Sequence, residues 1–438
     1  MRDPSPLGGF GITQIMWDKF RQIWKIKSLR NSVLFVLGML VIFRLAAHIP
    51  VPGIDAENLG KFLAGNQILG LLNLFSGGTM ENFSIVMLGV APYITSSIIF
   101  QLLSMVVPSL EELSKEGEAG QQKINMYTRL ATVPLAILQA YGMIQLLNKS
   151  QYQILPDLSV FRLVAMILTV TAGTVFLMWI GELITERKIG NGVSLLIFAG
   201  IMAALPQAVQ KAAVNYTPAD LYTYVLFIVI AVGTVIGVVV ISEGQRNVPV
   251  SYAKQIRGNR VYGGANTHLP LRVNMAGVIP IIFAISIILF PSMIAQFFVN
   301  GTGLSASIAR QVVGLFNNQA IYAIMYFVLV FGFTYFYTAV IFHPQKIAEN
   351  LQRQGGFVPG IRPGKETEKY LGHTMSRLIF SGALFLALIA ILPLILVAFT
   401  GTQSLAIGGT SLLIVVSVAI ETAKQIDAQL EVYEYDRM

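Results

Sequence analysis

Apolar segments long enough to cross a bilayer follow one another along the whole chain. About twenty residues of α-helix span the hydrocarbon core, and the sequence repeatedly offers such a stretch between polar connections. The pattern predicts an all-α polytopic membrane protein with ten transmembrane helices. We place the spans at residues 32–49, 83–107, 128–147, 161–181, 193–210, 221–241, 273–299, 319–342, 377–399 and 405–422.

Between the first two spans lies an apolar segment, at about residues 66–76, that has only about half the length of a span. Glycines at 60, 65, 77 and 78 bound it, so the chain can turn sharply at both ends. Half-length backbone at membrane depth is tolerated only where protein shields it or where it lines a cavity. The segment is predicted to be a re-entrant helix, and the alternative is a helix lying on the outer surface.

Two connections, residues 242–272 and 343–376, are much longer than the others. Both are rich in glycine and proline, and both hold an excess of arginine and lysine with aromatic residues between them. Loops of this length usually carry a function. Their charge would suit a polyanionic partner such as ribosomal RNA, or an acidic protein surface, although ordinary membrane topology also explains its sign.

The two ends of the chain are polar. Residues 1–31 combine basic side chains with apolar ones at helical spacing, which predicts an amphipathic segment lying on the membrane. A cleaved signal peptide is not expected, because the basic region is long and many spans follow. Residues 423–438 are predicted to be a charged extension of the last helix.

Lysine and arginine are distributed unevenly on the two sides of the predicted spans. With the N-terminus inside, 24 of the 30 lie in inner segments, five lie in outer segments, and Arg44 lies within a span. Cytoplasmic segments of membrane proteins carry the positive excess. Both termini are therefore predicted to be cytoplasmic.

Composition supports this class of protein and excludes others. The chain is 55% hydrophobic and 12% charged, whereas soluble domains are typically about 25% charged. There is no cysteine, which excludes disulfides and thiolate metal sites. The net charge of +8 is explained by the positive inner segments.

The sequence lacks the groups that catalysis or ion coupling would need. It has no GxxxxGK[ST], HExxH or GxSxG motif, and no span holds a pair of central carboxylates. We expect neither an enzyme nor a cofactor or metal. Arg44 lies about 8 Å from the outer end of its span, which suits a structural side chain that reaches the interface. A passive path is favoured, and a secondary solute transporter with inverted repeats is the alternative.

The ten spans can be divided into two halves of five, residues 32–211 and 212–422. An odd number of spans in each half would invert the halves relative to each other and place a path between them. We find no convincing residue-level repeat between the halves, so the inverted arrangement is conditional on this division.

Six stretches of the sequence carry a resemblance to a known family. They are Glu243–Lys254, Tyr262–Gly277, Gly355–Gly364, Ile49–Asp55, Gly190–Gly200 and Gly408–Val416. They closely resemble the SecY family, the channel subunit of the bacterial protein-export translocon, and the resemblance runs from about residue 15 to the last span. It implies a channel in the bacterial plasma membrane through which unfolded preproteins cross and membrane proteins enter the lipid.

The resemblance implies a two-halved clamshell with an hourglass pore, a plug helix and a ring of apolar side chains. The half-length segment corresponds to the plug, with Ile68, Leu69, Leu71, Leu72, Leu74 and Phe75. The ring positions correspond to Val90, Ile94, Ile197, Ile201, Ile282 and Ile414, with valine at 90 where the family often has isoleucine. Branched apolar side chains can dewet a constriction without binding a passing peptide; taken one by one, such residues are usually core or lipid-facing.

A lateral opening between the second and seventh spans is also implied. On the second span, Thr95, Ser96, Ser97 and Gln101 could hydrogen-bond across that seam when it is shut, or serve the helix structure alone.

The implied energy source lies in partners: a SecA-type motor ATPase or a translating ribosome, with SecE-like and SecG-like small membrane subunits bracing the halves. We expect the partner-docking surface to include Arg246, Lys254, Arg257, Arg260, Arg362 and Lys365. Asn247 stands where the family commonly has arginine, which is a departure from the family's pattern at this surface.

Overall fold

The computed structural model describes most of the chain between residues 21 and 435. The described part omits residues 53, 56–57, 61, 63–72, 74–75, 77, 149–153, 156–158, 215–220, 253, 258–259, 264–265, 300–302 and 401–405. Between residues 254 and 263 the description covers only backbone.

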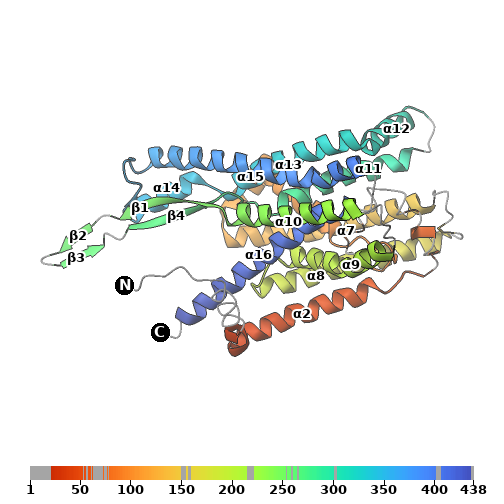
Figure 1. The fold of residues 1–438 in the computed structure, drawn as a ribbon, viewed down its shortest axis with the longest axis horizontal. Helices are drawn as coiled ribbons and strands as arrows, with labels where there is room; N and C mark the ends of the chain where they lie inside the picture. Colours follow the sequence, from red (N-terminus) through yellow and green to blue (C-terminus); the bar gives the residue numbers. More distant parts are fainter. Residues whose placement is uncertain are drawn as a thin grey trace.

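A helix overlaps each of the ten predicted spans. These helices are α2 (Lys27–Ala47), α5 (Ala91–Val106), α7 (Glu118–Asn148), α8 (Val160–Glu186), α9 (Gly192–Val214), α10 (Leu221–Glu243), α11 (Ile279–Phe298), α13 (Gln319–Ile341), α15 (Lys365–Thr400) and α16 (Ala406–Tyr435). They form an elongated bundle (Figure 1). Within the described residues, six helices are long and apolar enough to span a membrane on their own, so the total of ten spans stays a prediction. The fold is a polytopic, all-α membrane fold.

The second predicted span is wrong at its start. Helix α5 begins at Ala91, eight residues after the predicted boundary, because residues 79–90 form a series of hydrogen-bonded turns. Gly89 has a φ of +56°, a left-handed conformation that ends regular structure, and Pro92 stands in the first helical turn, where no N–H is needed. The turns are buried, with Val86 and Met87 fully inaccessible to solvent.

Three short helices were not predicted. Helix α6 (Pro108–Lys115) follows α5 at a bend of 100°. Helix α12 (Leu304–Asn317) joins α11 to α13, and α14 (Pro344–Arg353) follows α13. All three are shorter than a membrane span, so a search for span-length apolar segments does not find them.

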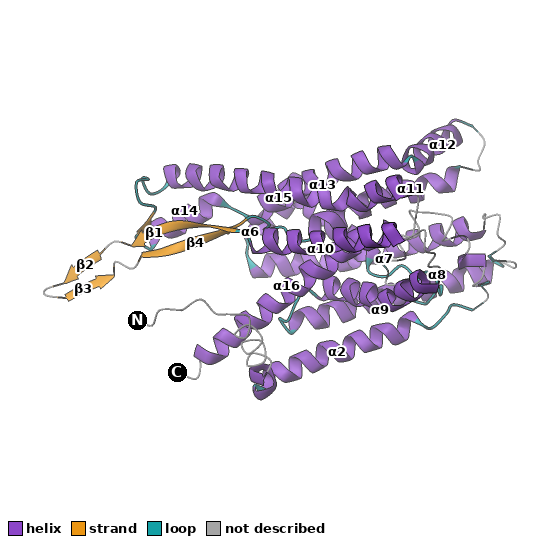
Figure 2. Ribbon diagram, in the orientation of Figure 1, coloured by secondary structure: helices purple, strands orange, loops and turns teal. Residues whose placement is uncertain are grey.

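The two long loops are structured and joined to each other, which the all-α expectation did not include. Strands β1 (Gln245–Tyr252) and β4 (Asn266–Arg272) form an antiparallel hairpin, extended by β2 (Lys254–Arg257) and β3 (Arg260–Gly263). Strand β5 (Gly356–Phe357), from the second loop, pairs with the end of β1, which gives the order β4-β1-β5. Figure 2 shows β1, β2, β3 and β4 at one end of the bundle, called the hairpin end below.

Two apolar cores hold these parts together. The larger core runs through the helices and includes residues of α2, α5, α7, α8, α9, α10, α11, α13, α15 and α16. The smaller one lies under the hairpin, where Val248 and Leu271 of the strands pack with Phe342, Leu371 and Met375. The hairpin is therefore anchored to α15 by an apolar core of its own.

Candidate functional site

The six predicted ring positions are buried together in the larger core. Their exposed fractions lie between 0% and 8%, and they come from four helices: α5, α9, α11 and α16. They are Val90, Ile94, Ile197, Ile201, Ile282 and Ile414. Burial in one apolar core is what a closed ring requires, but the core is large, so lining of a pore stays a prediction.

The segments that begin α5 and α11 repeat one sequence, which corrects the expectation that the halves share no residue-level repeat. Met87–Ile94 is MLGVAPYI and Met275–Ile282 is MAGVIPII, so both follow the pattern M-x-G-V-x-P-x-I. Since α5 belongs to the first predicted half and α11 to the second, the repeat relates the two halves.

The repeat is also one of backbone geometry. Gly89 and Gly277 have φ angles of +56° and +62°. The valines that follow are the N-cap residues, Val90 at φ −96°, ψ 5° and Val278 at φ −95°, ψ −7°. In both helices a proline occupies the first turn. The two helices therefore start in the same way at corresponding places.

The turn between α8 and α9 positions the two ring candidates of α9. An added Cβ at Gly192 would lie 1.8 Å from the Gly181 carbonyl oxygen, so only glycine permits this close approach. The Thr185 hydroxyl donates to that same carbonyl at 2.8 Å and accepts from the Gly192 N–H at 2.9 Å. Helix α9 thus starts at a fixed place, with Ile197 and Ile201 one turn apart on one face.

Helix α8 also supports the turns that precede α5. An added Cβ at Gly173 would lie 2.0 Å from the Ile85 carbonyl oxygen. We expect Gly173→Ala to destabilise the protein by about 1–3 kcal/mol, the usual cost of overpacking, because backbone must move. A lower midpoint of thermal unfolding in detergent would be the readout. Gly233→Ala is the matched control, since nothing lies within 4 Å of its Cβ position; an equal loss in both variants would contradict this packing argument.

The plug positions Ile68, Leu69, Leu71, Leu72, Leu74 and Phe75 lie outside the described residues. The chain that follows them is ordered by hydrogen bonds. The Thr79 hydroxyl contacts the carbonyl oxygens of Ser76 and Met87 at 3.1 and 3.3 Å. Gly89 lies against this connection, since its Cβ position is 3.2 Å from Ser76 Cα. The end of the predicted plug segment therefore packs directly at the start of α5.

The candidate lateral-gate side chains make their recorded bonds within the first half. Helix α5 contacts α11, as the predicted seam requires. However, the Ser96 hydroxyl donates to the Thr128 carbonyl on α7 at 2.7 Å, so this side chain serves the α5–α7 contact. Thr95 donates to the Ala91 carbonyl of its own helix, and Gln101 donates to Ser97 at 3.3 Å. For Ser96 this is the second of the two alternatives left open by the sequence, a role in helix structure, and a gate role of the four residues stays a prediction.

The docking candidates that the structure describes with side chains are exposed at the hairpin end. Arg246 lies on β1, Arg362 in the turn after β5, and Lys365 at the start of α15. Gly360 and Gly364 flank Arg362 with φ angles of +84° and +93°, and the buried Thr367 hydroxyl donates to the Arg362 carbonyl at 2.9 Å. The turn therefore presents the guanidinium outwards from a fixed backbone. The side chains of Lys254, Arg257 and Arg260 lie outside the description.

An ion pair that the sequence did not reveal joins two neighbouring helices. Arg129 of α7 pairs with Glu182 of α8, whose side chain is 21% exposed. Arg129 and Glu182 lie at the ends of two different predicted spans. Neither residue was therefore recognised from the sequence as a charged side chain within the membrane. Arg44 lies in the last turn of α2 with its guanidinium 5.9 Å from the Phe43 ring centroid, in agreement with a structural role. Among the described residues, no group of acidic and histidine side chains could hold a metal ion.

Comparisons with known proteins agree with one another. The family model described as SecY matches residues 84–423. A relative described as "Protein translocase subunit SecY", from Streptomyces galbus, is 42% identical over 437 residues, an alignment that covers 96% of this chain and 99% of the relative. A solved structure described as "The structure of a protein conducting channel" has a TM-score of 0.61 at 16% identity and 91% coverage of this chain and 92% of that one. Sec61 in the canine ribosome-channel complex has a TM-score of 0.57 at 15% identity, with the same coverage of both chains.

Proposed function

The chain belongs to the SecY family, and from that premise we propose how this particular channel seals, opens and is driven. It is the channel subunit of a protein translocase, a multi-pass membrane protein. We propose that the path is passive and that a ring of apolar side chains seals it. The ring is shut at rest and fits around the polypeptide during transport. Its members are Val90, Ile94, Ile197, Ile201, Ile282 and Ile414. The segment at 66–76 is proposed as the plug that blocks the ring.

The observation that carries the ring is the burial of all six side chains in one apolar core. Branched apolar side chains exclude water and ions when they touch, yet they form no specific hydrogen bond with cargo. A path for unfolded chains of every sequence needs both properties. The lone charged side chain well inside a predicted span, Arg44, lies on α2, which carries none of the six ring positions.

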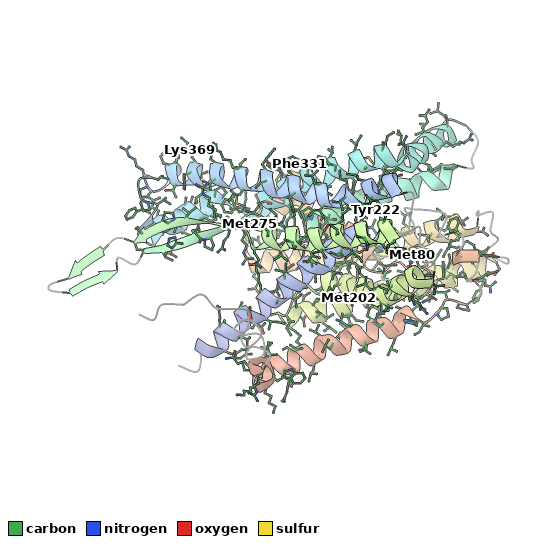
Figure 3. The ribbon with its side chains drawn as sticks, viewed as in Figure 1. Met80, Met202, Tyr222, Met275, Phe331 and Lys369 are labelled. Carbon is green, nitrogen blue, oxygen red and sulfur yellow. The ribbon has the colours of Figure 1, made fainter. Side chains whose placement is uncertain are left out.

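We propose two inverted halves with a seam between α5 and α11 through which apolar helices leave. The repeated start of these helices supports this arrangement. In Figure 3, Met80, ahead of α5, lies away from the hairpin end, whereas Met275, ahead of α11, lies towards it. The two segments thus approach their helices from opposite ends of the bundle, as an inverted pair would require.

The hairpin end is proposed to face the cytoplasm, where a motor ATPase or a ribosome docks. The charge asymmetry supports this orientation. The pairing of β1 with β5 supports one docking platform, because it attaches the turn that carries Arg362, after β5, to the strand that carries Arg246. The structural relative Sec61 in a ribosome-channel complex supports the ribosome as a partner.

Small SecE-like and SecG-like subunits are proposed to cover lipid-facing helices. Helix α10 is the strongest candidate, since only 11% of the residues in its most apolar stretch are buried within the chain. Val229 and Ile236 are among its highly exposed side chains.

Reconstitution tests the proposed function. Vesicles that hold the chain with its copurified small subunits should protect a preprotein from added protease only when a SecA-type motor and ATP are present. Uptake of a small solute driven by an ion gradient, without any preprotein transport, would instead support the secondary transporter.

A further inference from the structure

The two repeated segments contribute different numbers of residues to the proposed ring. Helix α5 contributes two residues one turn apart, Val90 and Ile94, whereas α11 contributes Ile282 alone. The residue one turn before Ile282 is Val278, which holds the position of Val90 in the pattern M-x-G-V-x-P-x-I. Val278 is therefore the one position of the repeat whose counterpart is a proposed ring residue while it is not.

The two pairs have matching geometry and burial. The Ile94 N–H donates to the Val90 carbonyl at 3.0 Å, and the Ile282 N–H donates to the Val278 carbonyl at 3.3 Å. Exposed fractions are 4% and 8% in the first pair, and 1% and 7% in the second. Residues four apart in a helix lie on one face, about 6 Å apart along the axis. A constriction lined by Ile282 is therefore bordered by Val278.

We propose that Val278 is a further residue of the seal, the second-half counterpart of Val90. The inference rests on the proposed ring. Each half then contributes the same valine–isoleucine pair from the N-cap and first turn of one helix, and since α5 contacts α11, the two pairs come from adjacent helices. The seal has two apolar layers at this place instead of one.

The test is the ion leak of reconstituted vesicles that hold Val278→Gly. We expect a leak roughly ten-fold above the unchanged chain, equal to that of Val90→Gly, because a dewetted constriction conducts once apolar volume is removed. Val238→Gly is the matched control: Val238 lies in the same core at 2% exposure, on α10. It should leak no more than the unchanged chain.

If Val278→Gly does not fold, Val278→Thr and Val238→Thr replace the pair, because threonine keeps the shape and adds a hydroxyl. A leak from Val278→Thr alone supports the proposal. Should Val90→Gly leak while neither Val278 variant exceeds its Val238 control, the assignment of Val278 is overturned and the ring stands. If Val90→Gly and Ile94→Gly also fail to leak, the ring itself is refuted.

A separate set of contacts concerns the last helix, α16. Its end segment, residues 422–433, is called the carboxyl-terminal tie here. Figure 1 shows it crossing from the bundle to the start of α2. The Lys424 ammonium lies 2.9 Å from a Glu243 carboxylate oxygen at the end of α10, so the tie is fixed to the second half.

The same segment bonds to the first half. Gln429 Nε2 donates to the Lys188 carbonyl, in the turn between α8 and α9, at 2.7 Å. The Ser28 hydroxyl on α2 donates to the Tyr433 hydroxyl at 2.6 Å. Gly190 permits the close approach, since its Cβ position lies 3.2 Å from the Thr422 hydroxyl oxygen.

We infer that the carboxyl-terminal tie is a fixed joint between the two halves, about which the α5–α11 seam opens. This inference also rests on the proposed function. Polar bonds and packing hold the halves at the tie. On α5, the helix that forms one side of the seam, the recorded bonds of Ser96 and Gln101 stay within the first half, and Gln101 Oε1 is buried without a hydrogen-bond partner. An unsatisfied buried oxygen weakens a closed contact.

The chain has no cysteine, so a crosslink can be placed at the tie alone. Lys188→Cys with Gln429→Cys, joined by a short bismaleimide, should transport preprotein within about two-fold of the uncrosslinked pair, since a joint between rigid bodies need not lengthen during opening. Loss of transport on crosslinking would overturn the inference. Transport by the untreated pair, measured first, keeps this outcome separate from failure of the proposed function.

Loosening the tie gives the complementary readout. Gln429→Ala with Tyr433→Ala should lower the midpoint of thermal unfolding and raise the ion leak several-fold, because the halves lose a joint. Val432→Ala, at a side chain 61% exposed on the same helix, is the control. Equal behaviour of the two variants in both assays would contradict a joint at this place.

Discussion

Replacing Ile94 and Ile201 together by glycine is expected to raise the ion leak of reconstituted vesicles at least about ten-fold. The two side chains come from different helices, α5 and α9, and are 8% and 3% exposed in the common core. Each substitution removes four carbons from the proposed ring. The space they leave can hydrate, and a hydrated constriction conducts ions. Membrane-potential dyes or planar-bilayer conductance would measure the leak.

An isoleucine-to-glycine substitution also lowers the stability of any helix and leaves a cavity in any core. The control variant must therefore have both of these effects. Ile144→Gly with Ile180→Gly removes two isoleucines that are 0% and 1% exposed on α7 and α8, outside the proposed ring. Each buried isoleucine lost should cost about 2–5 kcal/mol, with about 1 kcal/mol more for glycine in a helix. We expect the control to unfold more easily while its leak stays at the level of the unchanged chain. Equal leak from both double variants would remove the ring assignment.

Charge reversal at Arg362 is expected to reduce motor-driven preprotein transport by at least about ten-fold while leaving the leak unchanged. A guanidinium makes strong, directed bonds to carboxylates, and a glutamate in its place would repel the same partner. Two glycines with positive φ and the bond from Thr367 hold the turn, so the exposed side chain can change without unfolding the chain. Transport and the motor's ATPase rate in vesicles are the measurements.

Arg353→Glu is the matched control for this prediction. Arg353 is an exposed arginine at the end of α14 in the same connection, so its reversal changes the net charge equally. Only the Arg362 variant should lose motor affinity. If Arg362→Glu transports at the rate of the unchanged chain, or if both variants lose the same amount, Arg362 is not the specific contact.

Long apolar runs made the helices of this fold predictable, but they concealed where α5 begins. Residues 83–90 are as apolar as the helix that follows, and hydropathy therefore assigned them to the span. Gly89 and Pro92 decide the boundary through a positive φ and a missing N–H donor. That signal was present in the sequence, and the same pair at Gly277 and Pro280 would have revealed the repeat.

The hairpin was harder to predict for a different reason. In strand β1 only Val248 and Val250 show the alternation of buried and exposed residues that is typical of a strand. Pro249 between them argues against a strand inside a sheet. The structure resolves this conflict because β5 pairs only with Ser251 and Tyr252, so β1 has an open edge at Pro249. A pairing between distant loops cannot be read from either loop alone.

The ring positions could not be found from periodicity at all. All of these valine and isoleucine residues except Ile94 have apolar neighbours on both sides, so no helix face is marked. The family resemblance supplied them, and the structure adds their common burial. Val278 shows the converse: the repeat and the matching backbone angles indicate a residue that the resemblance did not supply.

The most direct test of the account asks whether a polypeptide in transit touches the ring. A photo-reactive side chain would be introduced at Ile94, Ile201, Ile282 or Ile414, one at a time, and a preprotein would be stalled in the channel by a folded domain at its end. Irradiation should join the preprotein to the channel at all four positions. It should not do so at Val229, which is 62% exposed on α10. Efficient transport with no more crosslinking at the four positions than at Val229 would contradict a path through the ring.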